Sequence, residues 1–128
     1  MSNSRSKLRR RTDSFLGVYD RNSDKLVGRL VDMTTDGVKL LCVTSIEQEA
    51  EFQFRMELPV DLRGSKEITF DAKSVWSKQD KVSHEYNIGF KILELSPKEK
   101  QKIQLLIDGP LFADDNERVH VTLSKKVT

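Results

Sequence analysis

The N-terminal segment, residues 1–11, has five basic residues and no acidic one: Arg5, Lys7, Arg9, Arg10 and Arg11. Arginine binds phosphate through two parallel hydrogen bonds. It pairs in a similar way with the O6 and N7 edge of guanine, and its flat face stacks on a base. A segment with several arginines could therefore hold a guanine and a phosphate together, although an ordinary solvated basic tail has the same composition.

Asp32, Thr34 and Gly37 form a second group, in a short segment between two apolar runs. This spacing would let the Asp32 carboxylate and the Thr34 hydroxyl present an acceptor and a donor from the same side. Gly37 can adopt a positive φ, which would let a ligand approach the backbone. The Asp36–Gly37 pair predicts a hairpin, and ordinary turns use the same residue types, so this segment by itself indicates only a turn.

Short apolar runs separated by turn residues predict six β-strands, over residues 15–19, 26–33, 38–43, 51–58, 68–76 and 86–93. The clearest is 51–58, in which every second residue from Phe52 to Leu58 is apolar, as in a strand with one face on the core. Pro59 is expected to end this strand, and residues 61–65 are expected to form a polar turn.

The periodicity changes after the last strand and predicts a short helix. Ser96, Pro97 and Glu99 match an N-cap, a first helical residue and a third helical residue. Gly109 is a typical stop. The apolar stripe of this helix is narrow, so docking on the strands must provide most of its stability. The stripe consists of Ile103, Leu106 and Ile107.

Six strands and one C-terminal α-helix indicate a mainly β protein, a small antiparallel barrel with the helix over one opening. We expect a flexible basic arm at residues 1–11, the barrel with its helix at 12–109, and a tail at 110–128. The alternation of residues 119–123 would allow an extra edge strand in that tail.

The chain has 128 residues, 37% hydrophobic and 33% charged, which fits one folded domain. Its net charge of +2 is unevenly distributed, because the arm carries +5 and the remaining 117 residues carry 17 basic and 20 acidic side chains. A basic arm suggests an anionic partner. The sequence shows no membrane-spanning run and no secretory signal, so we expect a cytoplasmic protein.

No motif indicates catalysis or metal binding. Cys42 is the single cysteine, which excludes an internal disulfide, and only His84 and His120 could join it in a zinc site. We expect Cys42 to be a small buried hydrophobe and both histidines to lie at the surface. Trp76 could stack on a ligand, but a place in the core is the stronger prediction. No phosphate loop or nucleophile motif is present.

Together and in this order, the two groups resemble the signature of the PilZ domain family, which is Arg-x-x-x-Arg followed about twenty residues later by Asp/Asn-x-Ser-x-x-Gly. Arg5 and Arg9 match the first part, and Asp32, Thr34 and Gly37 match the second, with threonine in the serine position. Lys7 and Arg11 have the same spacing, so the register of the arm is open. The Trp-bearing strand 72–77, the strand 86–90 and the helix entry 95–97 extend the resemblance.

The resemblance implies a six-stranded barrel with a C-terminal helix and binding of the bacterial second messenger cyclic di-GMP. It implies that Arg5 and Arg9 contact phosphate and guanine, that Arg10 or Arg11 adds charge, and that ligand binding orders the arm and changes contact with a downstream protein. Two alternatives stay open. One is a PilZ scaffold that acts only through a protein partner. The other is a small-barrel nucleic-acid-binding module, disfavoured because the strand faces look mixed or acidic.

Overall fold

The computed structural model describes residues 10–12 and 14–112. Within them it has seven strands and one helix. The strands are β1 (Arg10–Arg11), β2 (Gly17–Asp20), β3 (Leu26–Met33), β4 (Gly37–Cys42), β5 (Glu51–Leu62), β6 (Ser65–Gln79) and β7 (Tyr86–Ile92). The helix is α2 (Pro97–Ile107).

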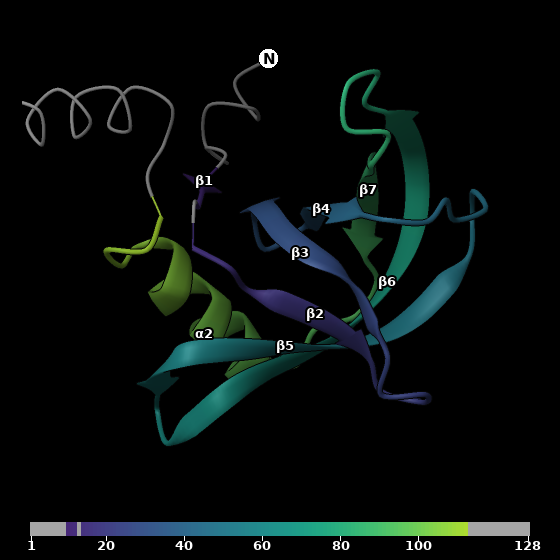
Figure 1. The fold of residues 1–128 in the computed structure, drawn as a ribbon. Helices are drawn as coiled ribbons and strands as arrows, with labels where there is room; N and C mark the ends of the chain where they lie inside the picture. The colour runs from purple at the N-terminus through teal and green to yellow at the C-terminus, as the bar shows by residue number, and fades with distance from the viewer. Residues whose placement is uncertain (1–9, 13, 113–128) are drawn as a thin grey trace, which may run out of the picture.

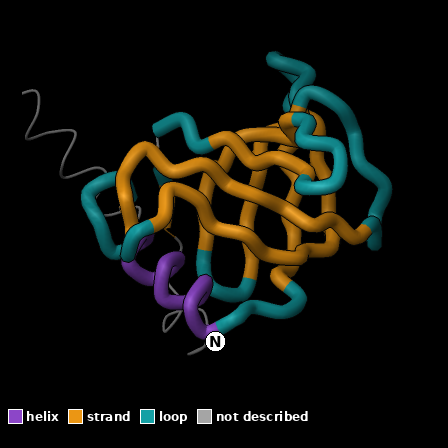
Figure 2. The backbone as a smooth tube through the Cα atoms, turned by 90° about the horizontal axis from the view of Figure 1, so that it is seen from below, coloured by secondary structure: helices purple, strands orange, loops and turns teal. Residues whose placement is uncertain are grey.

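All strand pairs are antiparallel, and their order is β1-β3-β2-β5-β6-β7-β4. An additional pairing of β3 with β4 closes the sheet into a barrel. Figures 1 and 2 show the strands crossing around the core, with α2 at one end of the barrel. The predicted six-stranded barrel with a C-terminal helix is therefore confirmed, and β1 is a short addition along the same edge of β3 as β2.

The expected arm overlaps β1, whose two residues pair with β3. At the other end, Phe112 is 6% exposed and packs in the core, beyond the expected domain boundary at residue 109. The residues predicted to form an extra strand, 119–123, lie outside the described residues, as does His120. The division of the chain into arm, barrel and tail stays a prediction.

Aromatic rings dominate the centre of the barrel. Phe54 is fully buried, stacks on Phe52 with 5.2 Å between ring centroids, and meets Phe70 and Phe90 edge-on at 5.7 and 5.1 Å. The alternation predicted for β5 is confirmed, because Phe54, Met56 and Leu58 are buried. Cys42 is buried as predicted, and burial raises the pKa of its thiol to about 11. His84 is exposed, as predicted.

The prediction that Pro59 ends its strand is wrong, because β5 continues to Leu62. The pairing of β5 with β6 is irregular between Glu57 and Leu62. A proline is tolerated there because no regular ladder bond requires its missing N–H. The hairpin turns at Arg63 and Gly64, which both have positive φ, 53° and 80°, as two-residue hairpin loops prefer.

Helix α2 begins as its sequence predicts. The Ser96 hydroxyl oxygen accepts a hydrogen bond from the Glu99 backbone N–H at 3.2 Å, and Pro97 is the first helical residue. The predicted stripe, Ile103, Leu106 and Ile107, is buried. The stripe docks the helix against the barrel next to β5 and β6.

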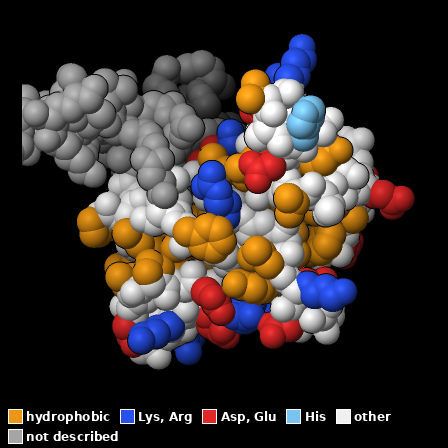
Figure 3. All heavy atoms as spheres, in the orientation of Figure 1, with side chains coloured by type: hydrophobic (Ala, Val, Ile, Leu, Met, Phe, Trp, Pro, Cys, Tyr) orange, Lys and Arg blue, Asp and Glu red, His pale blue; other side chains and the backbone are white. Residues whose placement is uncertain are grey.

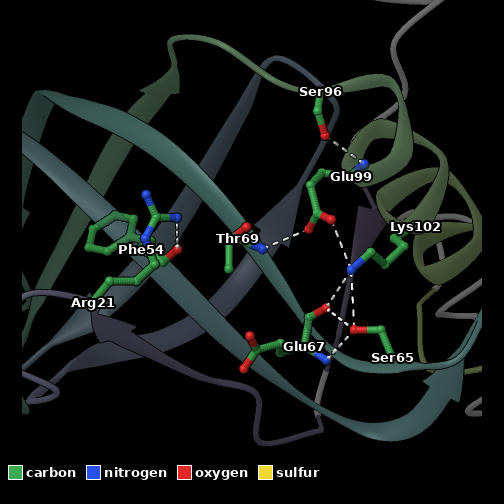
Figure 4. A network of polar contacts seen from close by, with 8 residues as sticks. All are labelled: Arg21, Phe54, Ser65, Glu67, Thr69, Ser96, Glu99 and Lys102. Carbon is green, nitrogen blue, oxygen red and sulfur yellow. Dashed lines mark hydrogen bonds and ion pairs between the residues drawn. The ribbon is translucent and has the colours of Figure 1, made fainter.

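A buried polar network fastens the same helix to β6 (Figure 4). The Lys102 ammonium lies 2.9 Å from the Glu99 carboxylate and donates to the Ser65 hydroxyl oxygen at 3.2 Å and the Glu67 carbonyl oxygen at 3.0 Å. The second Glu99 oxygen accepts from the Thr69 backbone N–H at 2.8 Å. Only 5% of the Lys102 side chain is exposed, so this lysine is a structural residue of the domain.

The face seen in Figure 3, over β2, β3 and β5, mixes apolar and charged side chains. Phe15, Tyr19 and Leu26 surround Gly17 on the outside of the barrel, and Phe15 is 65% exposed. The Arg55 guanidinium lies 4.6 Å from the centre of the Tyr19 ring. Hydrogen bonds to Glu57 and Asp24 raise the pKa of Arg55 above its usual value.

Candidate functional site

Strand β1 brings the end of the basic segment next to the second motif. Arg11 pairs with Asp32 and Arg10 with Met33, and the Thr12 backbone N–H donates to the Val31 carbonyl oxygen at 3.1 Å. The last two residues of the basic segment, about twenty residues before the turn in the sequence, are thus neighbours of the second group in the fold. Arg5 and Arg9 lie outside the described residues.

Asp32 lies on the outer side of the barrel wall although only 3% of it is exposed. Simple alternation from the buried Leu30 would turn its side chain inward. The register of β3 against β4 shifts between Leu30 and Asp32, so Asp32 instead faces Lys39, which alternates with the buried residues of β4. The Lys39 ammonium lies 3.6 Å from an Asp32 carboxylate oxygen.

Thr34 holds the turn between β3 and β4. Its hydroxyl oxygen accepts from the backbone N–H groups of Asp36 at 3.0 Å and Gly37 at 3.2 Å, and its own N–H donates to the Gly37 carbonyl oxygen at 2.9 Å. A hydroxyl has one proton to donate besides its acceptor sites. The Thr34 hydroxyl therefore fixes the turn and keeps a donor. The predicted hairpin is confirmed.

Gly37 does not use the positive φ that is open to a glycine. Among the described glycines only Gly64 has one, whereas Gly37 begins β4 in an extended conformation. Gly37 is required for a different reason: a Cβ at this position would lie 2.9 Å from the Phe90 carbonyl oxygen of β7. The absence of a side chain lets β4 and β7 pack closely next to the turn.

The prediction that Trp76 belongs to the core is also wrong. Trp76 is 39% exposed, because the register of β6 against β7 shifts between Ser74 and Trp76. The shift turns Trp76 to the outer face, opposite Gly89. A Cβ built on Gly89 would lie 2.1 Å from the indole nitrogen, so the indole rests directly against the backbone of β7.

Four of the residues described above and in the strand pairing form one row across the outer surface of β3, β4, β7 and β6. Asp32 of β3 pairs with Lys39 of β4, Lys39 with Gly89 of β7, and Gly89 with Trp76 of β6. Arg11 extends the row on the other side of Asp32. The row offers a carboxylate, an ammonium group and a flat aromatic surface, the groups that recognise the edge, phosphate and face of a nucleotide.

Comparison with known proteins supplies the family. A family model described as "PilZ domain" matches residues 3–109. The chain belongs to the PilZ domain family. PilZ domains are ligand-binding domains with a regulatory role. No curated protein matches the chain.

Three solved structures share the fold of this PilZ domain. The PilZ domain of YcgR from Escherichia coli with c-di-GMP has a TM-score of 0.62 and 17% identity, over 91% of this chain and 95% of that one. YcgR from Escherichia coli in complex with c-di-GMP has a TM-score of 0.61 and 17% identity, over 93% of this chain and 49% of that one. The inhibitor of motility MotI from Bacillus subtilis has a TM-score of 0.63 and 14% identity, over 79% of this chain and 47% of that one. The chain thus spans about half the length of the latter two.

Sequence reasoning did not select Lys39 for this part of the PilZ domain and placed Trp76 in the core. Lys39 follows Gly37 by two residues, so it lies on the same outer face of β4, which is a signal that the sequence contained. The position of Trp76 depends on the bulge before it, which leaves no mark in the apolar pattern.

Three further kinds of site concern the described part of this PilZ domain: a metal site, a membrane span and a second pocket. It has no group of three or more histidine, cysteine, aspartate or glutamate side chains that could hold a metal ion, and no helix there is long and apolar enough to cross a membrane. A polar depression of about 240 Å³ on β5 and β6 contains none of the predicted site residues. Its lining residues are Asn22, Glu51, Phe52, Gln53 and Asp71.

A Gly89→Ala substitution is expected to destabilise the PilZ domain by about 1–3 kcal/mol, as overpacking does, because the new methyl group would overlap the Trp76 indole. The measurement is urea unfolding followed by circular dichroism. In a Trp76→Ala background the same substitution should cost much less, since the overlapping ring is gone. An equal cost in both backgrounds would contradict the placement of the indole.

Proposed function

We propose that this protein is a cyclic di-GMP receptor whose site is formed by the basic segment and the Asp32–Gly37 turn. One observation supports this most strongly: Arg11, the last residue of the basic segment, pairs with Asp32. Membership of the PilZ family and the fold shared with YcgR, solved with c-di-GMP, add to it.

In this proposal the arginines of the arm, Arg5 and Arg9 with Arg10 or Arg11, bind the phosphates and the guanine edges. Asp32 accepts a hydrogen bond from guanine N–H groups, and the Thr34 hydroxyl donates its proton. Gly37 keeps the turn close to β7. Fixing the arm costs about 1–2 kcal/mol per residue, and each charge-assisted hydrogen bond returns about 1.5–3 kcal/mol. Several arginines are therefore required.

In this proposal the protein binds cyclic di-GMP without converting it, and it uses no cofactor, metal ion or catalytic residue. The ligand orders the arm across the barrel and thereby changes the surface that a downstream protein meets. The identity of that protein is open, because the chain spans about half of MotI and of full-length YcgR. A cytoplasmic location stays a prediction.

Calorimetric titration of the intact chain with cyclic di-GMP tests the proposal. The wild type should bind saturably, and Arg9→Ala or Asp32→Asn should each weaken binding about 10- to 100-fold, the loss of one charge-assisted hydrogen bond. Arg63→Ala, which removes an exposed arginine from the β5–β6 turn, is the control and should bind like the wild type.

Two results contradict the proposal. Heat with a single-stranded oligonucleotide and none with cyclic di-GMP would indicate a nucleic-acid-binding module. No heat with either would indicate a PilZ scaffold that acts through a protein partner. Circular dichroism of each variant shows whether a loss of binding reflects a loss of folding.

A further inference from the structure

The outer face of β4, β7 and β6 is strongly basic. The strand register places nine outward positions in three rows: Gly37, Lys91 and Lys73; Lys39, Gly89 and Trp76; Leu41, Asn87 and Lys78. Four of the nine are lysines and none is acidic. The expectation that the strand faces are mixed or acidic is therefore wrong for these nine positions, although two of the preceding outward residues of β6, Glu67 and Asp71, are acidic. We call Lys39, Lys73, Lys78 and Lys91 the lysine face.

The charges of the lysine face are only partly neutralised. Lys39 pairs with Asp32 at 3.6 Å, and Lys73 lies 3.4 Å from Glu49, whose side chain is 70% exposed. Lys78 and Lys91 are exposed and have no ion pair within the described part of the chain. The lysine face can therefore attract further negative charge.

Lys73 and Lys91 occupy directly opposite positions on β6 and β7. Like charges in this arrangement destabilise a sheet. Sequences break such local rules mainly where function requires it. Glu49 offsets part of this repulsion at Lys73, and an anionic ligand would relieve the rest.

The surface between the lysines suits a nucleotide. Gly37 and Gly89 have no side chains, so the floor of the middle of the face is backbone, and the Trp76 indole lies against Gly89. A planar ring can stack on a base while ammonium groups around it contact phosphate oxygens. The three strand spacings from Asp32 to Trp76 span about 14 Å at about 4.8 Å each, and Lys39 lies next to Asp32.

We infer that the lysine face is a further part of the nucleotide site, in which Lys73, Lys78 and Lys91 bind phosphate oxygens of the dinucleotide held at the Asp32–Gly37 turn. This inference rests on the proposed function. Lys39 belongs to both parts, because it lies beside Asp32 and within the lysine face. Strand β1 and the lysine face lie on opposite sides of β3.

The test is the affinity of the intact chain for cyclic di-GMP at two salt concentrations, measured for Lys73→Ala, Lys91→Ala and the double variant. Each single change should weaken binding about fivefold, the upper range for an exposed charge pair. The double change should weaken binding more than either single change but not by their product, because directly opposite lysines are coupled. The dependence of affinity on salt should also decrease. Lys98→Ala, an exposed lysine at the start of α2, is the matched control.

The outcomes separate this inference from the proposed function. If the wild type binds and Asp32→Asn does not, but the double lysine variant binds like the wild type with the same salt dependence, the lysine face is no part of the site. If the wild type does not bind, both proposals are wrong. If the lysines are needed for a single-stranded oligonucleotide and not for cyclic di-GMP, the face binds nucleic acid and the inference is overturned.

Discussion

A Phe54→Ala substitution is expected to reduce the free energy of unfolding by about 3–5 kcal/mol, the range for a deleted core phenylalanine. Phe54 is fully buried and its ring contacts the rings of Phe52, Phe70 and Phe90. Alanine would leave a cavity at the meeting point of β5, β6 and β7. Since small domains are stable by only about 5–15 kcal/mol, the variant should unfold at a much lower urea concentration.

Phe15 provides the matched control, because it is the same residue type with 65% of its surface exposed. Phe15→Ala should change the free energy of unfolding by about 0.5 kcal/mol or less, as surface substitutions do. Both variants are measured by urea unfolding at constant pH. Equal losses for Phe54→Ala and Phe15→Ala would mean that the three-ring contact is not the centre of the core.

The sequence was sufficient to predict the elements whose patterns are local. The alternation from Phe52 to Leu58 reports one buried face, and it needs no knowledge of the partner strand. The start of α2 is equally local, because Ser96, Pro97 and Glu99 satisfy the first turn among themselves. Both predictions are confirmed for this reason.

The same reasoning failed for Trp76, where a bulge interrupts the alternation, whereas Asp32 was assigned to the site by its motif and not by the alternation. Asp32 and Trp76 each follow a register shift, one on β3 and one on β6, and each side chain is turned to the outer face. A period of two carried past the shift assigns both to the interior. The two bulges place Asp32 and Trp76 in the same outer row. The candidate site therefore depends on the two positions at which the strands depart from regular alternation.

Pairing between distant strands was the other missing information. The like-charged neighbours Lys73 and Lys91 are 18 residues apart in the sequence, and only the register of β6 against β7 reveals that they face each other. Gly37 shows the same limit, because the group that excludes a side chain there is the Phe90 carbonyl of another strand. The motif residues were recognisable, while the basic surface next to them was not.

A Lys102→Met substitution is expected to destabilise the protein by about 3–5 kcal/mol, the range for breaking a buried ion pair by removing one partner. The Lys102 ammonium is the centre of the network in Figure 4, where it contacts Glu99, Ser65 and the Glu67 carbonyl. Without it the Glu99 carboxylate, whose side chain is 14% exposed, would keep the Thr69 N–H and lose its counter-charge.

A second substitution distinguishes the lost charge pair from lost packing. Adding Glu99→Gln to Lys102→Met removes the uncompensated charge, so the double variant should be more stable than Lys102→Met alone. Lys98→Met, at an exposed position on the same helix, should unfold like the wild type within about 0.5 kcal/mol. If Lys102→Met also stays within that range, the ion pair does not fasten α2 to β6, and the buried stripe of Ile103, Leu106 and Ile107 must hold the helix by itself.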